Sequence, residues 1–300
     1  MTMPNFFIIG AAKSATTSLY HYLSQHPQIY TSPLKEPRFF ALEGERLDFR
    51  GPGDREALRS SVTDIEAYRA LFDGVTDEIA IGEASPVYLY SPKAPERIRH
   101  YVPEAKFIAV LRDPAERAYS GFLHLVRDGL EPLDDFARTL EEEEVRAKRN
   151  YAPHWRYRDG GFYHAQLSRY FERFDEEQIR VYLYEDLKAD PMGVLRDVFG
   201  FLGVDEGFVP DLTFRHNVSS VPKNRRLHRL LTGPNAIRAG IRTLIPTGVR
   251  RRVTATVKSR NLRRPPQLSL EVRRQLIGAY REDILKLQVL IRRDLSSWLE

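Results

Sequence analysis

The sequence predicts an α/β protein with a central parallel β-sheet that is covered by helices on both faces. Four apolar runs of strand length, at residues 6–9, 79–83, 106–111 and 179–184, alternate with segments in which apolar residues have helical spacing. Strands that alternate with helices build a parallel sheet, because each crossover helix packs back onto a face of the sheet. The 300 residues, 42% of them hydrophobic, can bury a sizeable core, and we expect a single domain over residues 1–300.

The first strand runs into a loop of small residues that predicts a P-loop-like strand-loop-helix. Gly10 allows a sharp turn after residues 6–9, and Lys13 supplies a cation. A helix begins at residues 16–18, so that free backbone amides and the positive helix end point toward the loop. The spacing differs from that of nucleoside triphosphatases, because Ala12 stands where their pattern has glycine. An ordinary strand-to-helix turn with an exposed lysine is the alternative on this local pattern.

The segment between the first helix and the second long strand is predicted to be mostly irregular. A His-Pro pair at residues 26–27 ends the helix, and residues 28–30 are expected to be extended. Prolines on either side hold Glu36 in a loop. The polar residues 41–64 predict an excursion on the surface, and a helix is expected at 65–72.

The strand at 106–111 is the clearest in the chain, and it leads directly into a helix. Asp113 is placed to cap a helix over 114–126, which has proline at its first position. Polar residues at the carboxyl end of a strand and beside a helix start are where open α/β sheets bind ligands. Arg112 stands at this point, and Ser120 lies two helical turns further on. Arg112 could instead be a structural partner of Asp113 or of an acid elsewhere in the chain.

The remaining helices complete the alternation. We expect helices at 92–101, 161–174 and 191–202, and an acidic helix in which residues 141–144 form a solvated face. Ser269 can cap a long last helix. The apolar residues that recur there at helical spacing, and that we expect in the core, are Val272, Leu276, Tyr280, Ile284, Leu287, Ile291, Leu295 and Trp298.

The amino-acid composition excludes some kinds of catalytic and metal site and indicates the kind of partner. The chain has no cysteine, which excludes disulfides, cysteine nucleophiles and thiolate metal sites. Residues 212–270 hold 14 Lys and Arg and no Asp or Glu, although the net charge of the whole chain is only +5. Such a block suggests contact with a nucleotide, an acidic glycan, a membrane surface or nucleic acid, or merely a pair of solvated helices. No stretch is long enough to span a bilayer and no basic leader precedes the first apolar run, so we expect a cytoplasmic protein.

Three stretches together resemble the sulfotransferases that use 3′-phosphoadenosine 5′-phosphosulfate (PAPS). They are Gly-Ala-Ala-Lys-Ser-Ala-Thr-Thr-Ser-Leu at 10–19, Lys-Glu-Pro-Arg-Phe-Phe at 35–40 and Val-Leu-Arg-Asp-Pro-Ala-Glu-Arg-Ala-Tyr-Ser at 110–120. The bacterial and heparan-sulfate branch is the most similar, and the likeness extends over most of the chain. It implies in-line transfer of a sulfuryl group from PAPS to a hydroxyl or amine, with release of adenosine 3′,5′-bisphosphate (PAP). The acceptor would be a glycan, lipid or small molecule such as a natural product.

The resemblance also implies a role for individual residues. Glu36 matches the general base, Lys13 would stabilise the leaving phosphate, and His124 matches a histidine near the acceptor. The residues implied to hold the 5′-phosphosulfate are Lys13, Ser14, Ala15, Thr16, Thr17 and Ser18, and those implied for the 3′-phosphate are Arg112, Ser120, Arg225 and Arg226. The last two belong to the basic segment 212–270, which would cover the cofactor or the acceptor. We expect no metal and no nucleic-acid partner, whereas peripheral membrane contact through 212–270 is possible.

The chain departs from the family at two positions, and several simpler interpretations stay open. The family usually has glycine at the position of Ala15, where alanine in a left-handed conformation would cost on the order of 1 kcal/mol. The heparan-sulfate branch has lysine at the position of Ala84, which argues against a heparan-type acceptor. Apart from the resemblance, Glu36 could pair with Lys35 or Arg38, and His124 could be structural. The rival functions are a P-loop-type kinase and a non-enzymatic binder of an anionic polymer or membrane surface.

Overall fold

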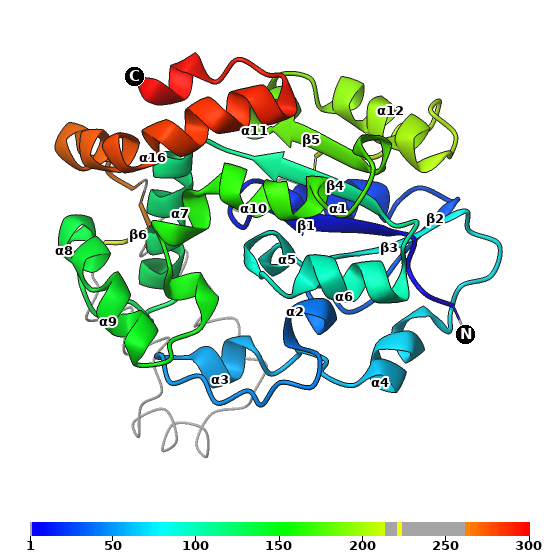
Figure 1. The fold of residues 1–300 in the computed structure, drawn as a ribbon, viewed down its shortest axis with the longest axis horizontal. Coiled ribbons are helices and arrows are strands. Elements are labelled where there is room, and N and C mark those ends of the chain that lie inside the picture. Colours follow the sequence, from blue (N-terminus) through cyan, green and yellow to red (C-terminus); the bar gives the residue numbers. More distant parts are fainter. Residues whose placement is uncertain (1, 214–220, 224–261, 264) are drawn as a thin grey trace.

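The computed structural model describes residues 2–213, 221–223, 262–263 and 265–300 (Figure 1). Its centre is a five-stranded sheet whose strands lie in the order β2-β3-β1-β4-β5. Every neighbouring pair in this sheet is parallel. The strands are β1 (Phe6–Gly10), β2 (Ile29–Thr31), β3 (Ala80–Ala84), β4 (Lys106–Leu111) and β5 (Ile179–Leu183). The predicted fold class is confirmed, and the short extended segment at 28–30 is the edge strand β2.

Helices cover both faces of this sheet, as the uninterrupted burial of β1 requires. Because successive strand residues point to opposite faces, Phe7 and Ile9 enter one core, whereas Phe6 and Ile8 enter the other. The smaller core is completed by α1 (Thr16–Leu23) and α12 (Pro191–Leu202). The larger core is completed by α5 (Val87–Tyr90), α7 (Pro114–Arg127), α10 (Tyr163–Phe171) and α16 (Leu270–Ile291).

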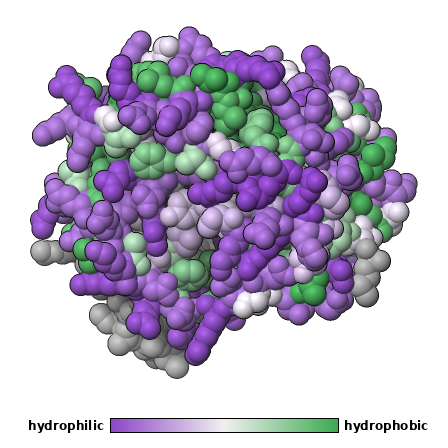
Figure 2. All heavy atoms as spheres, in the orientation of Figure 1, coloured by the Kyte–Doolittle hydropathy of each residue, from purple (hydrophilic) through white to green (hydrophobic). Residues whose placement is uncertain are grey.

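The shorter elements surround these layers. They are α2 (Phe39–Leu42), α3 (Asp54–Ala57), α4 (Ile65–Arg69), α6 (Ala94–Tyr101), α8 (Phe136–Glu141), α9 (Glu143–Lys148) and α11 (Tyr184–Ala189), with an antiparallel pair β6 (Val221–Pro222) and β7 (Leu262–Arg263). Hydrophilic residues cover most of the face shown in Figure 2, and hydrophobic residues form only small separate patches there. Within the described ranges, no helix combines the length and the apolar character needed to cross a bilayer.

Two predicted caps are confirmed, and two predicted helices need correction. The carboxylate of Asp113 accepts the first free amides of α7, and Ser269 caps α16. The acidic helix is in fact two short helices, α8 and α9, on either side of Glu142. α16 ends at Ile291, although Leu295 and Trp298 beyond it are still buried because the chain folds back in a short 3₁₀ turn.

Candidate active site at the carboxyl edge of the sheet

The loops that follow β1, β2, β3 and β4 meet at the carboxyl edge of the sheet. Since β1 lies between β3 and β4, the chain leaves β1 toward one side of the sheet and returns from β3 to the other. β1 and β4 therefore flank a topological switch point, where open α/β sheets bind ligands. Lys13 follows β1, Arg112 follows β4, and Glu36 lies in the loop after β2. The charges of Glu36 and Arg112 both act on Lys13, so the three predicted site residues lie near one another.

The loop after β1 has the backbone of an anion-binding turn. Gly10 is required there, because a Cβ at this position would lie 2.7 Å from the Cβ of Leu89. Lys13 and Ala15 both have left-handed φ values, 73° and 64°, and such alternation turns successive amides toward one side. Among the residues that the structure describes, no side chain caps the start of α1. The first amides of this helix can therefore face a ligand.

Ser14 adds a second sign of a ligand site. Its side chain is fully buried, and its Oγ has no hydrogen-bond partner within the part of the chain that the structure describes. Buried hydroxyl groups nearly always have a partner, because an unpaired one loses its bonds to water without replacement. A phosphate or sulfate oxygen would satisfy this hydroxyl, so the donors of this loop fit an anionic group.

Lys13 occupies an environment that disfavours its own charge. Burial is the main cause that lowers its pKa to about 8, and the positive charges of Arg127 and Arg112 lower it further, while Asp128 and Glu36 act in the opposite direction. Burial and neighbouring cations both disfavour the charged form of such a lysine. Its pairing with an anion therefore releases more free energy than pairing of an exposed lysine does. The loop and its neighbours thus form an anion site that is already assembled.

Replacing Ala15 with glycine tests the left-handed turn. Alanine at φ 64° carries a steric penalty that glycine does not, so the Ala15→Gly protein is expected to gain up to about 1 kcal/mol in free energy of unfolding. Ala12→Gly is the matched control, because Ala12 lacks a positive φ and its replacement only adds freedom to the unfolded chain. Urea unfolding at equilibrium measures both. A loss of stability in Ala15→Gly as large as in the control would contradict the proposed strain.

Arg112 is held at the end of β4 by an acid other than Asp113 and by an aromatic ring. Its Nη2 lies 3.3 Å from Oε2 of Glu116, and its guanidinium lies over the ring of Tyr184 at 5.0 Å from the centroid. Asp113 instead pairs with Arg273 at 2.8 Å. The structure therefore rules out a pair between Arg112 and Asp113 and leaves Arg112 positioned beside the switch point. Ser120 is buried on the same helix, α7.

Glu36 lies between two cations. Its Oε1 accepts from Nζ of Lys35 at 2.8 Å, and its Oε2 accepts from Nη2 of Arg38 at 2.7 Å. Burial alone would raise the pKa of Glu36, but Lys35 and then Arg38 outweigh it and hold the pKa below its ordinary value. Both of the simple pairings that the sequence allowed are present. Glu36 nevertheless remains part of the candidate site, because its negative charge also acts on the pKa of Lys13.

His124 lies on the last turns of α7 and is electrically neutral near pH 7. Burial is the first cause that lowers the pKa of its imidazole, and the positive charges of Lys13 and Arg127 lower it further. The guanidinium of Arg127 donates to its Nδ1 at 2.7 Å, and its Nε2 faces Asp128 at 3.6 Å. This arrangement suits a neutral hydrogen-bonding group rather than an imidazolium acid.

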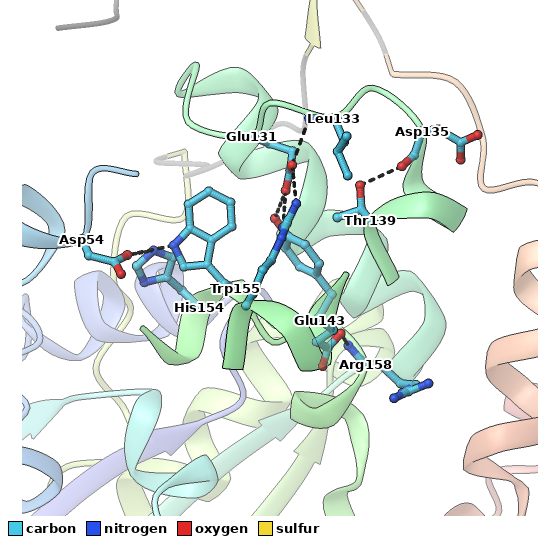
Figure 3. Close-up of polar contacts among 11 residues, drawn as sticks. Asp54, Glu131, Leu133, Asp135, Thr139, Glu143, His154, Trp155 and Arg158 are labelled. Carbon is cyan, nitrogen blue, oxygen red and sulfur yellow. Dashed lines mark hydrogen bonds and ion pairs between the residues drawn. The ribbon is translucent and has the colours of Figure 1, made fainter. Parts of the chain in front are cut away.

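A buried polar network fixes the segment that follows α7 (Figure 3). Both carboxylate oxygens of Glu131 accept from the guanidinium of Arg146, at 2.7 and 2.8 Å, and Oε2 also accepts from the hydroxyl of Tyr157 at 2.8 Å. The side chains of Glu131 and Arg146 are almost completely buried. Removal of one partner from such a pair typically costs 3–5 kcal/mol, so this segment has a defined conformation.

Asp54 joins the chain around Gly51 to the segment around Ala152 and Trp155, and its burial corrects a prediction. Residues 41–64 were expected to be a surface excursion, but Asp54 is fully buried. Its carboxylate accepts from the amides of Gly51 at 2.7 Å and Ala152 at 2.9 Å, and from Nε1 of Trp155 at 2.8 Å, as Figure 3 shows for the tryptophan. The two polar segments therefore form one fixed structure.

Glu143 corrects a second prediction. It was expected on the solvated face of residues 141–144, but it is buried because its carboxylate accepts from the amides of Arg158 and Asp159, at 2.8 and 2.9 Å. Figure 3 shows Glu143 and Arg158 in this contact. Local composition carried no sign of these distant donors.

The predicted site residues that the structure describes lie on the elements expected for them, around the loop after β1 and along α7. Arg225 and Arg226 lie outside the described residues. The sequence analysis missed Arg127 and Asp128, which act on both Lys13 and His124. Their positions three and four residues after His124 place them on the same helix face, and this spacing could have revealed them. In the described part of the chain, no group of three or more His, Asp or Glu could hold a metal ion.

Comparisons with known proteins point to one family. The model of the sulfotransferase family matches residues 4–208. The chain is 29% identical over 309 aligned positions to bifunctional heparan sulfate N-deacetylase/N-sulfotransferase 4 of Mus musculus, covering 99% of this chain and 31% of that protein. A crystal structure of a sulfotransferase from Alicyclobacillus acidocaldarius is 37% identical, with a TM-score of 0.80 and 100% coverage of both chains. The chain spans about a third or less of the first curated relatives that it matches.

Proposed function

This chain belongs to the sulfotransferase family, and from that premise we propose that it transfers a sulfuryl group from PAPS to a hydroxyl or amine of an acceptor and releases PAP. The observation that carries the proposal is the unpartnered, buried Oγ of Ser14 beside the destabilised cation of Lys13. An anionic group would satisfy both of these donors, and they lie where an open α/β sheet binds nucleotides.

In the proposed complex each end of the nucleotide has its own donors. Lys13, Ser14 and the first amides of α1 would hold the 5′-phosphosulfate, together with the hydroxyls of residues 16–18. Arg112 and Ser120 on the far side of the switch point would hold the 3′-phosphate. PAPS supplies the activated sulfuryl group. The protein contributes mainly by positioning the reactants and neutralising charge, as in phosphoryl transfer.

Glu36 and Lys13 would act on opposite ends of the transfer. Glu36 is ionised at neutral pH and can accept the proton of the acceptor hydroxyl or amine. A carboxylate is a weak base against an alcohol, so proton removal must accompany attack rather than precede it. Lys13 would stabilise the charge that develops on the departing phosphate. The neutral His124 would orient the acceptor by a hydrogen bond.

Titration calorimetry with PAP tests the nucleotide assignment, with ADP and magnesium as the control. The proposal predicts metal-independent binding of PAP and little binding of ADP. A P-loop-type kinase would instead bind ADP only with magnesium. A non-enzymatic binder of anionic polymers would bind neither nucleotide tightly and would hold heparin in a manner that collapses as salt rises.

Arg112→Ala tests the 3′-phosphate site separately. Loss of one charge-assisted contact is expected to weaken PAP binding roughly 10- to 100-fold and to leave AMP binding almost unchanged, because AMP has no 3′-phosphate. Arg59→Ala is the matched control, since Arg59 pairs only with Glu56 at an exposed position among the contacts described. Calorimetry measures the affinities of the native chain and of both variants for PAP and for AMP. Unchanged PAP affinity in Arg112→Ala would refute the assignment.

Two polar segments of fixed structure are the candidates for selecting the acceptor. We propose that residues 41–64 and 128–160, joined by Asp54, shape the acceptor side of the site, and that the basic segment 212–270 covers cofactor or acceptor. The matched relatives include enzymes named for heparan sulfate, but this chain has Ala84 where that branch has lysine. A panel of glycans, lipids and phenols, scored by PAP release, would identify the acceptor.

A further inference from the structure

Arg127 and Asp128, at the end of α7, are two charged residues that the proposed reaction does not use. They follow His124 by three and four residues, so the three side chains lie on neighbouring positions of the last helical turn. The amide of Asp128 donates to the carbonyl of His124 at 2.9 Å, which closes this turn. The contacts among the three side chains determine what the imidazole can do.

The contact between Arg127 and His124 determines which ring nitrogen carries the proton. Nη2 of Arg127 lies 2.7 Å from Nδ1 of His124. A guanidinium group has only donors and does not lose its proton in proteins, so Nδ1 must be the acceptor and has no hydrogen. The reversed ring orientation would place the carbon Cδ2 there, and 2.7 Å is too short for a contact between carbon and nitrogen. In the neutral imidazole the proton is therefore on Nε2.

Asp128 favours the same arrangement from both of its oxygens. Its Oδ1 accepts from Nε of Arg127 at 3.2 Å, which helps to fix the guanidinium with Nη2 toward His124. Its Oδ2 faces Nε2 of His124 at 3.6 Å, which is too long for a hydrogen bond. The negative charge at this distance still favours a proton on Nε2 rather than on Nδ1.

The surroundings of His124 keep its imidazole neutral, so that one tautomer describes it. Burial is the first cause that lowers its pKa, and Lys13, Arg127 and His154 lower it further, whereas Asp128 raises it. Lys13 comes from the loop after β1, and His154 comes from the 3₁₀ turn Pro153–Trp155, which packs against α7. An imidazolium would also require a hydrogen on Nδ1, directly against the donor of Arg127.

We propose that Arg127 is a positioning residue for His124, because by donating to Nδ1 it fixes the tautomer that carries its proton on Nε2. His124 can then donate a hydrogen bond from Nε2, but it has no nitrogen left that could take up a proton. In the proposed reaction it donates to a lone pair on the acceptor substrate, such as that of a hydroxyl oxygen, and proton removal is left to Glu36. This last step rests on the proposed function, whereas the tautomer does not.

The tautomer is tested by ¹H–¹⁵N NMR correlation of the histidine rings in the ligand-free protein at pH 7.5, with His124 assigned by its loss in His124→Gln. We expect a protonated Nε2 and an unprotonated Nδ1 that accepts a hydrogen bond. In Arg127→Met the Nδ1 resonance should move toward that of an unbonded nitrogen. The titration midpoint should rise by about one pH unit or more, because a charge that opposes protonation is lost.

Arg59→Met is the matched control, because it makes the same change at an exposed arginine that pairs with Glu56, and it should move neither signal. Arg127→Gln also removes the positive charge and should raise the midpoint in the same way, which covers the case in which Arg127→Met does not fold. A proton on Nδ1 in the native chain, or an unchanged Nδ1 resonance in Arg127→Met, would overturn the proposal. No nucleotide is used, so absence of PAP binding would refute the proposed function and leave this result intact.

The positioning role in the reaction is tested by a double-mutant cycle. Turnover is measured at saturating PAPS in Arg127→Met, in His124→Gln and in the variant that carries both changes. If Arg127 acts through His124, the double variant should be as active as His124→Gln alone, within about twofold. Losses that multiply would show that Arg127 acts independently of His124 and would refute the positioning role.

Discussion

Replacing Glu36 with glutamine is expected to lower turnover roughly 10²- to 10⁴-fold, while the affinity for PAP changes little. Glutamine keeps the size of the side chain and can still meet Lys35 and Arg38 through its carbonyl oxygen, but it cannot accept a proton. The pKa of Glu36 lies below its ordinary value, so the carboxylate is ionised throughout the neutral range and its replacement removes a base that is always available. PAP release from PAPS, with an acceptor found in the panel above, measures the rate.

The control for this experiment is Glu56→Gln. Glu56 carries the same chemical change on an exposed side chain that pairs with Arg59, so it should leave turnover unchanged. Calorimetry with PAP separates a loss of chemistry from a loss of binding. Near-normal turnover in Glu36→Gln would remove Glu36 from the role of base, and a parallel loss of PAP affinity would make it a binding residue instead.

The sequence was sufficient for features that depend on neighbouring residues. The apolar run at 106–111 predicted β4, and the Asp113–Pro114 pair predicted the capped start of α7, because both signals lie within a few residues of the structure that they specify. The sulfotransferase family was also identified from three short motifs, and the comparisons confirm it. The roles of Lys13, Glu36, Arg112 and the other candidate residues stay predictions.

The features that the sequence could not show depend on distant partners. Asp54 and Glu143 are ordinary acids in polar segments, and each is buried only because donors about 100 and 15 residues away reach it. Glu83 looked like the end of an apolar strand, whereas its hydroxyl partner Tyr68 lies on helix α4, fifteen residues earlier. The order of strands that places Lys13 beside Arg112 is likewise a property of the whole sheet.

Replacing Lys13 with alanine is expected to lower turnover roughly 10²-fold or more, because one preorganised charge beside the departing phosphate is lost. Lys13→Arg keeps a positive charge at this position. The PAP affinity of the native chain should fall as the pH rises through about 8, because Lys13 then loses its proton in the free protein. Arginine does not deprotonate in this range, so Lys13→Arg should keep its affinity up to about pH 9. A native affinity that does not change between pH 7 and 9 would contradict this role.

The lowered pKa of Lys13 also makes the stability of the folded protein depend on pH. Because the pKa of Lys13 is lower in the folded chain, at about 8, than its ordinary 10.5, the unfolded chain binds more protons between these two values. The contribution of this group to stability therefore rises with pH across that window, and below pH 8 the charged Lys13 destabilises the free protein. An anion that pairs with Lys13 reverses this penalty. The thermal stabilisation by PAP should accordingly be larger at pH 7 than at pH 9.5, and Lys13→Ala should remove most of that difference, since the alanine variant has no proton to exchange at this position.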